Sequence, residues 1–196
     1  MPSERCQSKA HRDSGVVAVE TAAVSMLLII LLFGIVESSF LFRDYISVSA
    51  AARAGARMGT SQPRSASFAQ DSANQVANAV SDLDPANIQE VWVYKAAVTS
   101  IAATSTDKPF GFNDFSNCTV CVKFTWNAVT KSLTQSFGNW TYVSQNACAG
   151  DPARDSLGVY VKYKHNSPLG FFFQNMTLSE SAVMWIEPTS AAICKP

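Results

Sequence analysis

Hydrophobic residues are concentrated in one long segment near the start of the chain. From Val16 to Val36 there are 21 residues, of which Glu20 is the only charged one. At about 1.5 Å per helical residue, this segment crosses a hydrocarbon layer of about 30 Å. It is longer than the apolar core of a secretory signal peptide and lacks the periodic polar positions of a helix on a soluble protein. The segment therefore predicts a single membrane-spanning helix.

The helical pattern continues beyond this segment to about residue 60, where a Gly-Thr-Ser-Gln-Pro stretch ends it. Small residues at 50–52 and 54–56 would allow another helix to approach closely. At about 100° per residue, four basic side chains fall in or near one sector and form a stripe: Arg43, Arg53, Arg57 and Arg64. Such a stripe suits either lipid phosphates or acidic residues of another chain.

The rest of the chain predicts a small α+β unit. Residues 64–80 repeat apolar and small positions at i+4 spacing, which indicates a second, amphipathic helix, and residues 82–87 predict a turn. Four later segments alternate with period two, which predicts an antiparallel sheet with one buried face: 90–102, 120–126, 159–164 and 178–187. We expect an α+β fold, in which a long N-terminal transmembrane and membrane-proximal helix carries a head made of this sheet and one covering helix.

Cysteine usage indicates which side of the membrane the head occupies. Cys6 lies in the N-terminal tail, and the other four of the five cysteines lie in the head. In an oxidising compartment these four would form two disulfides. Residues 118 and 121 of one extended strand would face opposite sides, so each needs a distant partner. We expect the pairs Cys118–Cys148 and Cys121–Cys194.

Orientation rests on this argument, because basic residues flank the span almost equally on both sides. The short tail and the four head cysteines favour a cytoplasmic N-terminus and an extracytoplasmic head.

Charge and candidate chemistry exclude several functions. The chain has 15 Lys and Arg and 15 Asp and Glu, and this balance argues against a nucleic-acid binder. It has only two histidines and contains no nucleophile elbow, zinc-protease motif or phosphate-binding glycine loop. We expect no catalytic residue, metal or cofactor. Two Phe-rich segments, 110–115 and 171–173, either fill the core or form an exposed binding tip, and core filling is the commoner use.

Two motifs resemble a known family. The sequence Ser-Gly-Val-Val-Ala-Val-Glu at 14–20, followed by the apolar segment, is similar to a class III (type IVb-like) prepilin signal, in which a basic leader ends in Gly and the fifth mature residue is Glu. Together with Ala-Ala-Arg-Ala-Gly-Ala-Arg at 51–57, residues 15–37 resemble the TadE-like pseudopilins of the tight-adherence, or Flp pilus, system. Thr21 departs from the aromatic residue that often follows the Glu in that family.

The resemblance implies that a prepilin peptidase cuts this chain between Gly15 and Val16. Residues 1–15 would be a cytoplasmic leader that is removed, together with Cys6. Residues 16–60 would form the transmembrane and membrane-proximal helix, and residues 61–196 the extracytoplasmic head.

The resemblance also implies a function in pilus assembly. Glu20 would meet the new terminal ammonium group, and Glu37, Arg53 and Arg57 would act in recognition or assembly. The protein would be a non-enzymatic minor pilin or pseudopilin in a bacterial cell membrane, with the peptidase, other pilins or pseudopilins, the Tad assembly platform and membrane lipid as partners. The alternative is a single-pass, membrane-anchored extracytoplasmic binding module whose leader is not cleaved.

Overall fold

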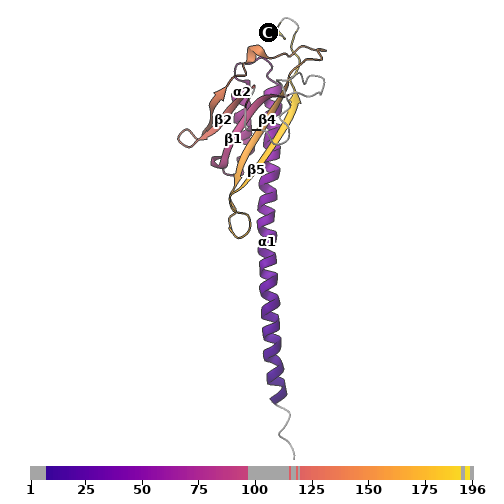
Figure 1. Cartoon of the computed structure of the whole chain (residues 1–196), viewed down its shortest axis with the longest axis vertical. Helices are drawn as coiled ribbons and strands as arrows, with labels where there is room; N and C mark the ends of the chain where they lie inside the picture. Colours follow the sequence, from indigo (N-terminus) through magenta and orange to yellow (C-terminus); the bar gives the residue numbers. More distant parts are fainter. Residues whose placement is uncertain (1–7, 97–114, 116–117, 119, 191–192, 195–196) are drawn as a thin grey trace, which may run out of the picture.

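One long helix carries a small head at its C-terminal end (Figure 1). The computed structural model describes residues 8–96, 115, 118, 120–190 and 193–194, with side chains from residue 15 onward. Helix α1 (Ser8–Thr60) has 53 residues, and none of those from 15 to 36 is buried. Within the described residues, α1 is the one helix long and apolar enough to cross a membrane. The expected α+β fold class, with its long N-terminal helix, is confirmed.

The described part of the head contains a five-stranded antiparallel sheet of order β3-β2-β1-β4-β5 and one further α-helix, α2 (Phe68–Ala79). Two short 3₁₀ turns, η1 (Pro85–Asn87) and η2 (Tyr142–Ser144), join these elements. The strands are β1 (Ile88–Ala96), β2 (Cys121–Asn127), β3 (Ser132–Gly138), β4 (Ser156–His165) and β5 (Met176–Trp185). Four of them match the predicted segments. Strand β3, a largely polar edge strand, was not predicted.

Both helices cover one face of the sheet. Val48 and Ala52 of α1 and Val76 of α2 are buried in one cluster with Val91 of β1 and Val159 of β4. The sequence pattern predicted that the second helix alone covers the sheet. Because α1 also packs on β4 and β5, its upper half is part of the head's core and not a free stalk.

Small residues of α1 permit this close packing. A Cβ added at Gly55 would lie 2.6 Å from Val76 Cγ2 and 3.1 Å from the Ser72 carbonyl oxygen. The Ser72 hydroxyl donates a hydrogen bond of 2.7 Å to the Gly55 carbonyl oxygen. The small residues near position 55 therefore bring α1 against α2 of the same chain.

The second face of the sheet is also buried at its centre, whereas the alternation predicted one buried face. Trp92, Tyr94 and Tyr160 point to this side, and Phe115 stacks on Tyr160 with ring centroids 3.7 Å apart. Burial raises the pKa of Tyr94 to about 12, so its phenol is neutral at physiological pH. Phe115 thus fills the core, as expected for the first Phe-rich segment; residues 110–114 of that segment lie outside the described residues.

The disulfides differ from the expected pairing. Cys118 is bonded to Cys121, with Cα atoms 5.7 Å apart, and Cys148 is bonded to Cys194, with Cα atoms 4.7 Å apart. Strand β2 begins at Cys121, so Cys118 precedes it and the rule of opposite faces does not apply. The predicted pairs Cys118–Cys148 and Cys121–Cys194 are therefore wrong for this structure.

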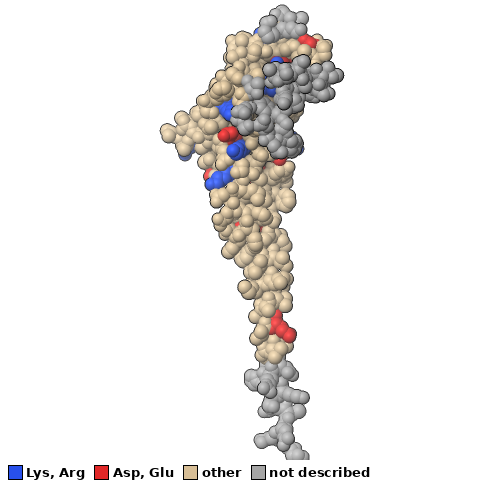
Figure 2. All heavy atoms as spheres, viewed as in Figure 1, with Lys and Arg blue, Asp and Glu red and all other residues tan. Residues whose placement is uncertain are grey.

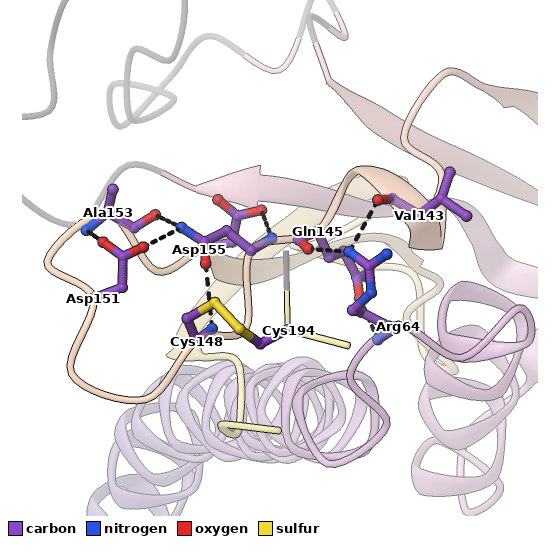
Figure 3. Close-up of a disulfide and its surroundings, with 9 residues drawn as sticks. Arg64, Val143, Gln145, Cys148, Asp151, Ala153, Asp155 and Cys194 are labelled. Atoms are coloured by element: carbon purple, nitrogen blue, oxygen red, sulfur yellow. Dashed lines mark hydrogen bonds between the residues drawn. A yellow bond between two sulfur atoms is a disulfide. The ribbon is translucent and has the colours of Figure 1, made fainter. Parts of the chain in front are cut away.

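Figure 3 shows the Cys148–Cys194 bridge with Arg64 in its surroundings. Arg64 has a φ of 57° and donates from its side chain to the carbonyl oxygens of Val143, at 3.0 Å, and Gln145, at 2.7 Å. The Glu187 amide donates to the Thr60 carbonyl oxygen at 3.0 Å. This network fastens the head to the last turn of α1, and it removes Arg64 from the predicted basic stripe.

We expect Gly55→Ala to destabilise the head, because the added methyl group meets α2. Overpacking of this kind costs about 1–3 kcal/mol. The measurement is denaturant unfolding in detergent, followed by tryptophan fluorescence. Gly34→Ala is the matched control, because its Cβ would meet only Phe172 Cε2, at 3.9 Å. Equal stability of the two variants would contradict the packing argument.

A tryptic digest without reduction distinguishes the two disulfide arrangements. The peptide that ends at Lys123 contains both Cys118 and Cys121, so it should be released alone. The peptide 132–154, with Cys148, should be joined to the peptide that begins at His165, with Cys194. The pairing expected from the sequence would instead join all three peptides.

Candidate functional site at the junction of the long helix and the head

The residues singled out in the sequence lie at three heights along α1 and do not form one cluster. Gly15 and Glu20 lie near its lower end, and Glu20 is exposed. Glu37 lies 17 residues further on, about 25 Å along the helix axis. Arg53 and Arg57 lie higher still, where the head is attached. In Figure 2 the lower helix is an uncharged surface interrupted by acidic atoms at one place.

Glu37 is fully buried, although no residue from 15 to 36 is. Its Oε1 accepts hydrogen bonds of 2.7 Å from the Ser167 hydroxyl and the Phe171 amide. Its Oε2 accepts a third bond, also of 2.7 Å, from the Phe172 amide. Three donors around one carboxylate make the kind of concave anion site that successive backbone amides form. Glu37 therefore binds the head of its own chain.

The donors come from the loop between β4 and β5, residues 166–175, which is the lowest part of the head and lies beside α1 (Figure 1). Gly170, at a φ of 70°, turns the chain so that the amides of Phe171 and Phe172 point at the helix. The Ser167 hydroxyl accepts a bond of 3.2 Å from the Gly170 amide while it donates to Glu37. The loop is held in shape by its own hydrogen bonds.

A second buried polar pair joins α1 to the head two turns above Glu37. His165, the last residue of β4, donates from Nδ1 to Asp44 Oδ2 at 2.6 Å. Both residues are buried, and Arg43 lies 3.3 Å from the other Asp44 oxygen. The partner of His165 was not predicted from the sequence. The seven-residue spacing of Glu37 and Asp44, which puts two acids on one helix face, was a signal of this contact.

The opposite side of α1 is exposed from residue 15 to residue 57. Phe42 and Ile46 are 65% and 64% exposed, and Ala50, Arg53 and Arg57 continue the same side of the helix. In the described part of the chain, the guanidinium group of neither arginine forms an ion pair or hydrogen bond. This face, residues 42, 46, 50, 53 and 57, is called the outward stripe below. It is apolar near the membrane segment and basic farther up.

Core filling is the commoner use of a Phe-rich segment. The second such segment, residues 171–173, does not fill the core. Phe171 and Phe172 are 68% and 53% exposed. Phe171 stacks on Phe33 of α1, with ring centroids 5.6 Å apart. The rings lie against the apolar part of the helix because the backbone between them is bound to Glu37. Among the residues that the structure describes, no three metal-ligating side chains form a cluster.

The fold and this junction define a class of protein: a single apolar helix, long enough to anchor a chain in a membrane, that is bound along its upper half to a small α+β head. Residues 15–57 match the family model of the TadE-like proteins, so the resemblance predicted from the sequence is confirmed over this segment. Neither the search of curated proteins nor that of solved structures finds a significant match. This match suggests involvement in the Tad pilus system.

We expect Glu37→Gln to loosen the β4–β5 loop, because an amide oxygen cannot replace both carboxylate acceptors. A buried donor without an acceptor costs about 1–3 kcal/mol. Locally this corresponds to hydrogen exchange about 5- to 150-fold faster at Phe171 and Phe172. Exchange measured by mass spectrometry on peptides from this loop checks the prediction.

The exposed Glu20 provides the matched control, because Glu20→Gln makes the same chemical change lower on the same helix. That variant should leave exchange in the loop unchanged. Equal exchange in the Glu37→Gln variant and the unsubstituted protein would show that Glu37 does not hold the loop.

Proposed function

We propose that this protein is a non-enzymatic minor pilin or pseudopilin that takes part in assembly or anchoring of Flp-type (Tad) pili. One observation carries the proposal: the TadE-like match over residues 15–57 begins at Gly15 and includes Glu20 at the spacing of a prepilin signal. The long helix and its attached head are consistent with this role. Its partners would be a prepilin peptidase, other pilins or pseudopilins, the Tad assembly platform and membrane lipid.

The peptidase would cut between Gly15 and Val16 on the cytoplasmic face. Helix α1 begins at Ser8, so the peptidase must unwind helical turns around this bond before cutting it. A Cβ at Gly15 would have no neighbour within 4 Å, so the head does not obstruct this unwinding. Glycine also lets a protease approach the backbone closely.

Glu20 would have a partner once the leader is removed. A carboxylate within a membrane is costly unless it is paired or protonated. Cutting after Gly15 creates an ammonium group on Val16, four residues before Glu20 and on the same side of the helix. That ammonium, from the same chain or from a neighbouring pilin, would pair with the carboxylate and lower the cost of burying both.

The proposed orientation places residues 1–15 in the cytoplasm, residues 16–60 across and just above the membrane, and residues 61–196 outside the cytoplasm. The bonds Cys118–Cys121 and Cys148–Cys194 support it, because disulfides persist in oxidising compartments. Removal of the leader also takes away Cys6, so that the exported part keeps an even number of cysteines.

Contact with neighbouring pilins would use the outward stripe, because the other side of α1 is occupied by the head. Phe42 and Ile46 would pack on a neighbouring helix, and Arg53 and Arg57 would pair with acidic groups of that neighbour. Whereas Glu37 was expected to act in recognition or assembly, its burial against residues 167–172 supports a role in positioning the head.

In cells that contain a prepilin peptidase, we expect the unsubstituted protein to lose residues 1–15 and the Gly15→Ala variant to stay uncut. The added methyl group hinders the close backbone approach that cleavage requires. Intact mass of the purified protein is the measurement. A full-length mass for the unsubstituted chain would rule out the cleavage and favour a membrane-anchored binding module with no leader removal.

Two variants serve as controls for this experiment. Gly34→Ala makes the same substitution in the same helix, 19 residues after the cleavage site at Gly15, and should be cut normally. Glu20→Ala should also be cut, while pili counted by electron microscopy fall in number, because the terminal ammonium loses its partner. Normal piliation with Glu20→Ala would remove the proposed charge pairing but not the cleavage.

A further inference from the structure

The β4–β5 loop, residues 166–175, contains no Asp, Glu, Lys or Arg. The nearest such residues are Lys164 in β4 and Glu180 in β5. Its tip exposes Phe171 and Phe172, and Leu169 beside them is 38% exposed. We define the Phe tip as residues 169–173. Large exposed apolar side chains that lie together are uncommon on a water-facing surface and mark a contact with another apolar phase or molecule.

The Phe tip lies at the height of the membrane segment. Phe171 stacks on Phe33, and Phe33 lies three residues before Val36, the last residue of the apolar run. This places the ring about 5 Å inside the end of that run. If the bilayer instead extends toward Phe42, past the hydrogen-bonded Glu37, the tip lies deeper still. Both placements bring the Phe tip into the hydrocarbon of the leaflet on the head's side.

Several backbone polar groups of the Phe tip form hydrogen bonds within the protein, as a medium without water requires. Chain that enters lipid must satisfy its polar groups internally. The amides of Phe171 and Phe172 are bound by Glu37, and that of Gly170 by the Ser167 hydroxyl. The Gln174 side chain donates to the Gly170 carbonyl oxygen. Three amides and one carbonyl oxygen of the tip are thus bonded to the helix or within the loop, while the rings of Phe171 and Phe172 lie beside the helix and stay more than half exposed.

Two apolar grooves run beside these rings. One, of about 440 Å³, lies between Phe171 and the helix down to Ala22, and the other, of about 730 Å³, lies between Phe172 and the helix up to Phe42. Both are continuous with the exposed surface of the membrane-spanning segment, which itself requires lipid. The occupants that this continuity favours are acyl chains of membrane lipid.

We propose that the Phe tip is a lipid-binding wedge: Phe171 and Phe172 insert between acyl chains on the head's side of the membrane, and Glu37 holds them at that depth. The inference rests on the membrane span, but not on leader cleavage or on pilus assembly. The wedge would seat the head directly on the bilayer surface, so that the membrane and the helix together fix the head's orientation.

The test uses the full chain in lipid nanodiscs, one chain per disc, with brominated phospholipids that quench tryptophan fluorescence on contact. The variants Phe172→Trp, Leu28→Trp and Val129→Trp are compared after subtraction of the signal from the unsubstituted protein. Leu28 reports the membrane span, and Val129, 92% exposed in the turn between β2 and β3, reports water. Near-ultraviolet circular dichroism of each variant checks the fold, and Phe171→Trp replaces Phe172→Trp if that variant is misfolded.

We expect loss of fluorescence at position 172 with bromines placed near the glycerol end of the chains, and loss at position 28 with bromines near the terminal methyl groups. Position 129 should lose no fluorescence with either lipid. Quenching at 28 but not at 172 would overturn the wedge and leave the span intact. Quenching at neither position would overturn the span itself. A tryptophan at 172 that is unquenched in single-chain discs but blue-shifted in discs with several chains would instead assign the tip to a second copy.

Discussion

The hydrogen bonding of Glu37 determines how the rest of the molecule is arranged. A carboxylate at the end of an apolar helix needs donors, and in this chain they come from residues 130 to 135 positions later in the sequence. Meeting that need requires the turn between β4 and β5 to lie against α1. The position of the sheet then follows. Strand β4 ends at this turn and β5 begins after it, so both strands lie along the helix above the turn, and β4 is also paired with β1. The Asp44–His165 pair continues the same line of contact.

Most of the secondary structure was predictable because it depends on local periodicity. The apolar run required a long helix, and alternation marked the strands around Trp92, Phe124 and Tyr160. Strand β3 was not predictable in this way, because it lies at the sheet edge and only Leu133 of its side chains is buried. The disulfide pairing was not predictable either, since it depended on whether Cys118 belongs to the strand that begins at Cys121.

The residues of the candidate site also differ in whether local sequence was enough to predict them. Gly15 and Glu20 are found from the resemblance to a prepilin signal, because the proposed cleavage needs only a local motif. Glu37 was identified through the resemblance to the TadE-like proteins, but its partners come from residues 130 to 135 positions later in the chain. Likewise, nothing in the residues around His165 shows that Asp44 lies against it. Such contacts follow from the strand order, which periodicity does not reveal.

The lowest and highest polar attachments between the head and α1 are well separated, and this has a mechanical consequence. Glu37 and Thr60 are 23 residues apart, so the two attachments are separated by about 35 Å along the axis. A pull along the helix is therefore shared between a carboxylate near the membrane and a network near Cys148–Cys194. Because Glu37, Asp44 and Thr60 of α1 are all bonded to the head, a rotation of the helix about its axis would rotate the head with it.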